Sequence, residues 1–109
     1  MAKNMKNNLP AFPENISDKI GYEEGSIVSK IIFNSDKLQI TLFAVAKGES
    51  FEKHIATKEA IVHIMEGEGE FYLENEWKTF KSGDYFYMPE GMVHALRAKT
   101  DFKFLLYLF

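Results

Sequence analysis

The sequence predicts an all-β domain, built as an antiparallel sandwich or barrel, and three observations carry this prediction. From Ser26 onward, short runs rich in Ile, Val, Phe and Tyr alternate with Gly, Asn, Asp and Ser at intervals of roughly 8 to 12 residues. No segment is long and helical enough to serve as a βαβ crossover. Hydrophobic residues make up 46% of the chain and ten residues are Phe, so a dense core can form without metal or disulfide.

The predicted strands follow one another across short polar turns. The first two, residues 26–33 and 38–46, flank Asn-Ser-Asp-Lys, a sequence that favours a hairpin turn. Residues 60–65 and 69–74 are predicted to form a second hairpin, because Gly67 between them tolerates a positive φ. The other strands, which bring the expected number to about eight, are predicted at residues 77–80, 85–89, 93–98 and 102–109.

A chain of 109 residues is long enough for one domain and too short for two. Residues 1–13, rich in Asn and interrupted by two prolines, are predicted to be a flexible N-terminal lead-in. Residues 14–109 are then expected to form a single barrel domain with little helix.

Composition and charge exclude several classes of function. There is no cysteine, which excludes disulfides, thiolate nucleophiles and Cys-based metal sites. The net charge of −3 is spread along the chain, so no nucleic-acid partner is expected. No stretch reaches the roughly 18 apolar residues of a membrane helix, so we expect no membrane partner and a cytoplasmic protein.

The last predicted strand, residues 102–109, is apolar on both faces. Strict alternation puts three of its apolar side chains on the outer face, which are Leu105, Tyr107 and Phe109. An apolar outer face is usually covered. The cover is either the N-terminal segment or a second copy of the chain, and a homodimer is the expected assembly.

Two groups of residues match the motifs of a known family. Gly83, Pro89, Gly91 and His94 fit G-x5-P-x-G-x2-H-x3-N, with alanine at the Asn position. Gly48, His54 and Gly67 fit G-x5-H-x-H-x3-E-x6-G, with Ala56 and Ala60 replacing the second His and the Glu. In both motifs the chain resembles the cupins, specifically the small single-domain type. The resemblance implies a double-stranded β-helix, a jelly-roll barrel.

The resemblance also implies a place for a metal. In metal-binding cupins, the residues equivalent to His54, Ala56, Ala60 and His94 converge on one divalent ion, such as Zn, Fe, Ni or Mn. Here only the two histidines of that ligand set are present, and Glu59 lies one residue from the glutamate position, which reverses its side in a strand. The same parity makes His63 an outward-facing side chain. A tight site is not expected, because stable sites use three or four protein ligands.

Three roles stay open for His54 and His94. They can be polar residues of the barrel mouth, weak metal ligands completed by solvent or substrate, or acid and base groups without metal. The two alanines predict a roomy, mostly apolar cavity with a small organic ligand. Its expected lining is Ala56, Ala60, Val62, Ile64, either Tyr85 or Phe86, and Met88.

The favoured function is therefore a binding protein for a small organic ligand, with or without a weakly held metal. The alternative is a metal-dependent enzyme of the oxygenase, isomerase or decarboxylase type that uses His54 and His94. A sugar-nucleotide epimerase is disfavoured, because Arg97 is the only arginine available for phosphate binding.

Overall fold

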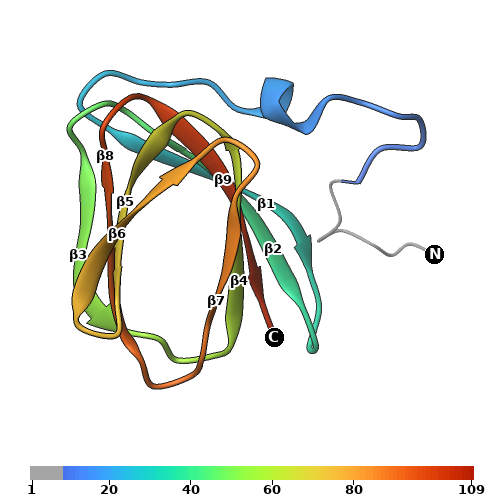
Figure 1. Ribbon diagram of the computed structural model, residues 1–109. Coiled ribbons are helices and arrows are strands. Elements are labelled where there is room, and N and C mark those ends of the chain that lie inside the picture. Colours follow the sequence, from blue (N-terminus) through green and yellow to red (C-terminus); the bar gives the residue numbers. More distant parts are fainter. Residues whose placement is uncertain (1–8) are drawn as a thin grey trace.

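Two antiparallel β-sheets face each other and enclose the core in the computed structural model, which describes residues 9–109 (Figure 1). One sheet has the strand order β1-β2-β9-β4-β7 and the other β3-β8-β5-β6. The strands are β1 (Ile27–Asn34), β2 (Gln39–Val45), β3 (Ser50–Ile55), β4 (Ala60–Glu66), β5 (Glu68–Leu73), β6 (Glu76–Lys81), β7 (Tyr85–Met88), β8 (Val93–Ala98) and β9 (Phe102–Leu108). This double-stranded β-helix confirms the predicted fold class.

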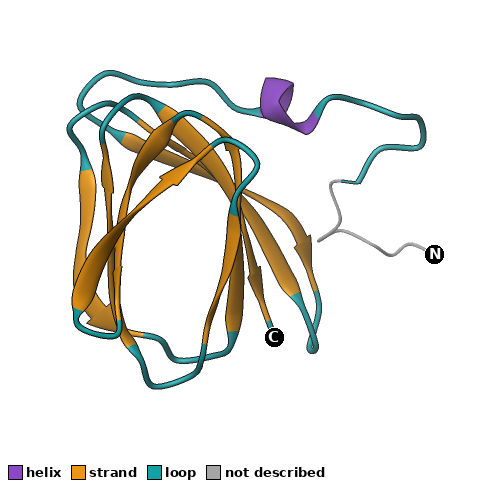
Figure 2. Ribbon diagram, in the orientation of Figure 1, coloured by secondary structure: helices purple, strands orange, loops and turns teal. Residues whose placement is uncertain are grey.

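Helix is scarce, as predicted. Figure 2 shows one short helical turn in the described part of the chain, the 3-10 helix η1 (Ile16–Lys19). Within residues 9–109, no helix combines the length and the apolar character needed to cross a bilayer. Residues 1–8 of the predicted lead-in lie outside the described residues.

The first predicted hairpin is confirmed and the second is wrong. β1 pairs with β2 across the Asn-Ser-Asp-Lys turn. β4 and β5 instead lie in different sheets, with β4 between β9 and β7, and β5 between β6 and β8. The chain changes sheet at Gly67, where φ is 85°. A Cβ at this position would run into the carbonyl oxygen of Asp101 and the side chain of Phe102, so glycine makes a tight corner here, not a hairpin turn.

One strand was not expected from the sequence. β3 is an edge strand of the smaller sheet, and nearly all its side chains are exposed. It therefore lacks the alternation of apolar and polar residues by which half-buried strands are detected. The omission matters, because β3 carries His54.

Phenylalanine rings pack against one another between the sheets. Phe43 stacks on Phe104 with ring centroids 4.8 Å apart, and Phe51 meets both rings edge-on. Phe71 stacks on Phe86 at 4.0 Å. Such pairs stabilise a core beyond the area they bury. The barrel is consequently packed through much of its length.

The N-terminal segment covers part of the outer face of the five-stranded sheet. Ile20 packs with Leu42 and Leu105 in a second apolar cluster, and Ile16 and Tyr22 contact it. This segment therefore covers Leu105. The N-terminal segment was one of the two covers that the sequence left open. Phe109 remains 43% exposed. The expected homodimer remains a prediction.

Candidate functional site

The two histidines of the motifs meet across two neighbouring strands. His54 on β3 and His94 on β8 are direct partners in the antiparallel ladder. Their ring centroids lie 4.0 Å apart, with an interplanar angle of 63°. His94 is buried, with 8% of its surface exposed, whereas His54 is exposed. Residues forty positions apart in the chain thus form one site.

A β-bulge aims His54 at its partner. Phe51 pairs with Leu96, but the next registered pair is His54 with His94, so β3 contains one more residue than β8 in this interval. In a regular strand, residues three apart face opposite sides. The bulge lets Phe51 enter the core while His54 reaches His94.

The hydrogen bonds of both rings define their tautomers. Nδ1 of His54 lies 2.9 Å from the carbonyl oxygen of Glu52, and Nδ1 of His94 lies 3.2 Å from that of Met92. A carbonyl oxygen only accepts, so each Nδ1 carries the hydrogen and donates it. In the neutral ring, Nε2 then holds a lone pair. Neither Nε2 has a hydrogen-bond partner in residues 9–109, and both can accept a proton donor or bind a metal.

The environment of His94 favours its neutral form. Burial lowers the pKa of His94 below its ordinary value of 6.5, and the nearby His54 lowers it further. The hydrogen bond to the carbonyl of Met92 opposes this shift and raises the pKa. Because the net direction is downward, the Nε2 lone pair of His94 is available near neutral pH.

A cavity of about 220 Å³ opens beside the two imidazoles. It lies at the end of the barrel where the β3–β4 connection meets β8 and the last residues of β9 (Figure 1). The lining residues are His54, Ile55, Ala56, Thr57, Lys58, Ala60, Met88, His94, Leu106 and Leu108. Most of the lining residues are apolar, and those with polar side chains are His54, Thr57, Lys58 and His94.

Three of the six predicted lining residues lie at this cavity, and three do not. Ala56, Ala60 and Met88 line it. Val62 and Ile64 face inward as alternation predicts, but both are fully buried in the aromatic core, where no space is left for a ligand. The cavity is shallower than expected because phenylalanine rings fill the barrel at their level.

The sequence left Tyr85 and Phe86 as alternatives for one position of the lining, and neither lines the cavity. Tyr85 pairs with His63 on the outer side of the sheet and is 76% exposed, so its placement at the cavity is wrong. Phe86, the next residue on β7, is the one that turns inward and pairs with Val62. His63 lies on the outer face, as predicted from its parity.

Sequence reasoning missed Thr57 and Lys58, and also the role of Leu106 and Leu108. Alternation along β9 already groups the two leucines with the inward-facing Phe102 and Phe104, so that signal was present. Thr57 and Lys58 lie in the connection between β3 and β4, for which no periodic pattern exists.

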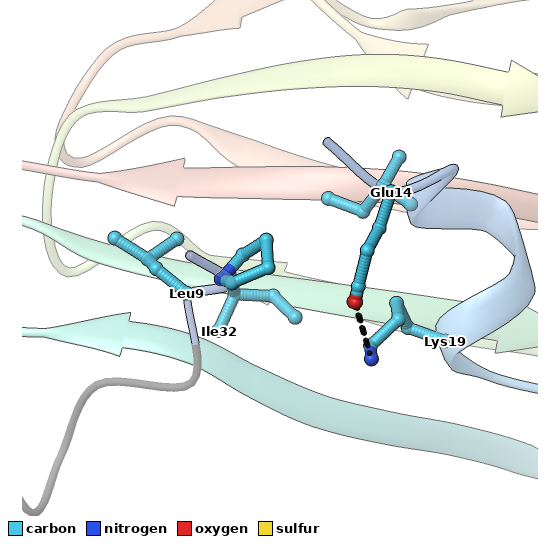
Figure 3. A pocket seen from close by; sticks show the side chains of 6 residues that line it. Leu9, Glu14, Lys19 and Ile32 are labelled. Carbon is cyan, nitrogen blue, oxygen red and sulfur yellow. Dashed lines mark hydrogen bonds and ion pairs between the residues drawn. The ribbon is translucent and has the colours of Figure 1, made fainter. Parts of the chain in front are cut away.

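A smaller hollow lies under the N-terminal segment and shares no residue with the histidine cavity. Figure 3 shows it between Leu9, Ile32 and the ion pair of Glu14 with Lys19, whose charged atoms are 3.0 Å apart. Its volume is about 90 Å³. It contains no imidazole, so it offers no comparable chemistry.

Comparison with known proteins assigns the family. The family model described as "Cupin domain" matches residues 41–108. The chain belongs to the cupin superfamily. This cupin is 30% identical over 98 residues to an uncharacterized protein of Aquifex aeolicus, covering 88% of this chain and 81% of that protein.

Solved structures agree with the family. The cupin matches a conserved Streptococcus pyogenes protein of unknown function with 28% identity and a TM-score of 0.90, over 99% of this chain and 96% of that one. It matches a cupin superfamily protein from Desulfitobacterium hafniense with 25% identity and a TM-score of 0.89, over 98% of both chains.

The donor groups of this cupin do not fit a metal held by protein ligands alone. Within residues 9–109, no group of three or more His, Asp or Glu side chains is placed to hold an ion. The candidate substitute, Glu59, accepts a hydrogen bond from the Tyr87 hydroxyl at 2.7 Å on the outer side of the sheet. Two imidazoles are fewer than stable sites use. An ion here would need solvent or a ligand to complete its coordination.

Proposed function

We propose that this cupin binds a small organic ligand in the cavity beside His54 and His94. One observation carries the proposal: two imidazoles with unpaired Nε2 atoms meet at a mainly apolar hollow. Ligand sites are typically of this kind, with apolar walls and few convergent polar groups. The cavity volume of about 220 Å³ lies below the ~300 to 1,000 Å³ of drug-sized sites, so the ligand is small.

The imidazole pair can also hold a divalent ion weakly, with the organic ligand or water as further donors. Zn, Fe, Ni and Mn are the candidate ions, because histidine nitrogen is a common ligand for such metals. This arrangement supports a second candidate function, a metal-dependent enzyme of the oxygenase, isomerase or decarboxylase type. The incomplete set of protein donors favours ligand binding without a resident metal.

The experiment follows metal and thermal stability together. The protein is purified without a metal-binding tag, its metal content is measured by elemental analysis, and Mn, Fe(II), Ni or Zn is then added. An ion present at 100 times its dissociation constant stabilises the fold by ~2.7 kcal/mol. We expect little metal as purified, and any shift on addition to disappear in His54→Ala and His94→Ala.

His63→Ala is the matched control, because His63 lies on the outer face and leaves the cavity intact. A full equivalent of tightly bound metal in the purified protein would favour the enzyme over the binding protein. A metal-induced shift that survives in both cavity variants would place the ion elsewhere and contradict the site.

A further inference from the structure

The charge around the histidine cavity indicates the class of its ligand. Among the ten lining residues, Lys58 is the one with a full charge when the imidazoles are neutral, and none is acidic. We infer that the ligand is a small organic acid whose carboxylate is bound by the Lys58 ammonium at the rim. This inference rests on the proposed function.

Lys58 lacks a counter-charge within the described part of the chain. Its ammonium takes part in none of the ion pairs of residues 9–109, which involve Lys19, Lys78, Arg97, Lys99 and Lys103. The next residue, Glu59, directs its carboxylate to the Tyr87 hydroxyl instead. A carboxylate at the rim would give Lys58 a charge-assisted hydrogen bond, the stronger kind of hydrogen bond.

The remaining walls suit the apolar body of such an acid. Ala60 and Met88 are buried, and Leu106 and Leu108 complete an apolar side. Two alanines leave space that larger side chains would fill. The ligand thus combines one anionic end with a short chain or a single ring, which matches a volume of about 220 Å³.

Lys53 provides a matched control, because it lies on β3, just before the connection that carries Lys58. Its ammonium lies 4.1 Å from the centroid of the Tyr72 ring and does not line the cavity. Lys53→Gln therefore removes the same charge from the same part of the molecule without changing the rim. Any general effect of net charge on anion binding will appear in both variants.

The test uses the full chain, freed of metal with a chelator, and acids paired with their neutral amides. Benzoate with benzamide and butyrate with butyramide are titrated by calorimetry, and amide chemical shifts locate the binding. At least one acid should bind at the cavity about tenfold more tightly than its amide. Lys58→Gln should weaken that acid by about tenfold and leave the amide unchanged, whereas Lys53→Gln should change neither.

The failures of the two proposals are distinguishable. If an amide binds the cavity as tightly as its acid, or if Lys58→Gln leaves the acid affinity unchanged, the organic-acid inference is wrong and the binding function stands. If no acid and no amide binds, both are overturned. Melting temperatures of the two lysine variants verify that each is folded. Both lysines are exposed, so neither replacement should disturb the core.

Discussion

His54 and His94 explain why the site needs both sequence motifs. Each imidazole donates its Nδ1 hydrogen to the carbonyl two residues earlier in the chain, so the backbone orients both rings. This frees Nε2 on each ring. The ring separation of 4.0 Å is compatible with two neutral imidazoles but opposes two positive charges.

The lowered pKa of His94 predicts acid sensitivity. The folded state disfavours the proton that the unfolded state accepts near pH 6.5, so the contribution to stability is fully present above that pH. It is lost as the pH falls below 6.5 and toward the folded-state pKa, by at most ~1.4 kcal/mol per pH unit. Urea unfolding at several pH values should show this loss, and His94→Gln should reduce it.

His63→Gln is the control for this experiment, since His63 lies outside the cavity on the opposite side of its sheet. If the free energy of unfolding fell with the same slope on acidification in His94→Gln and in wild type, other groups would cause the loss. His94 would then not be the source of the acid sensitivity.

The site was predictable at some residues and not at others. Motif spacing identified His54 and His94, because their register is fixed by glycines and a proline at turns. Alternation correctly turned Ala60 inward and His63 outward. The sequence left Phe86 and Tyr85 as alternatives on β7, and the structure turns Phe86 inward and Tyr85 outward. Lys58 could not be predicted, because a connection has no periodicity.

At the scale of elements, a partly buried network of hydrogen bonds ties the N-terminal segment to the barrel. The Tyr22 hydroxyl donates to the Glu66 carboxylate at 2.7 Å, and the largely buried Lys103 ammonium donates to the carbonyl of Ser17 at 2.6 Å. Burial raises the pKa of Tyr22, and the Glu66 carboxylate raises it further. The hydroxyl therefore stays protonated and continues to donate.

Tyr22→Phe should remove this contact and keep the ring in place. A hydrogen bond to a charged group contributes roughly 1.5 to 3 kcal/mol, so we expect a loss near ~1.5 kcal/mol in urea unfolding. Tyr72→Phe is the matched control, because within residues 9–109 the Tyr72 hydroxyl makes only one exposed contact, of 3.4 Å with Asn75 Oδ1. Equal effects of the two substitutions would contradict a role for the network.

The corner at Gly67, where the chain passes from one sheet to the other, leads to a second prediction about the elements. Gly67→Ala combines a positive φ with contact to the backbone of Asp101, whereas Gly83→Ala has a positive φ and open space around it. Gly83→Ala should lower the free energy of unfolding by roughly 1 to 2 kcal/mol. Gly67→Ala should lower it by at least ~2 kcal/mol more, because the neighbouring backbone must move to make room for the methyl group. Similar unfolding energies for the two variants would disprove the tight corner.

Local turn chemistry predicted one hairpin and misled on the other. Asn-Ser-Asp-Lys closes β1 onto β2 because both strands lie in the same sheet. Gly67 gives the same local signal, but the partners of β4 and β5 come from distant segments, which short-range patterns do not report. The family motif carried this information, since it fixes the fold as a whole.

For the whole molecule, Ala56 and Ala60 stand at two of the four positions that match the ligands of metal-binding cupins. Ala56→His with Ala60→Glu restores the ligand types of the first motif in a cavity that already holds two imidazoles. We expect zinc affinity, measured by competition with a chromophoric chelator, to rise by about 100-fold or more. His94→Ala in the same background should abolish the gain.

Ala60 is almost fully buried, so its replacement can cost about 1 to 3 kcal/mol. Circular dichroism and the single variant Ala56→His, at a position on the cavity wall, separate misfolding from failure to bind. A folded double variant with unchanged zinc affinity would contradict the proposed placement of these positions around one centre.

Ring NMR of the three histidines reports tautomer, protonation and ligand contact at each imidazole separately, so it tests the histidine site itself. We expect hydrogen on Nδ1 of His54 and His94, and shifts of both Nε2 resonances when an organic acid that binds is titrated in, with His63 unaffected. If the cavity pair carried hydrogen on Nε2, or if His63 responded to the ligand while His54 and His94 did not, the site would not be the one described.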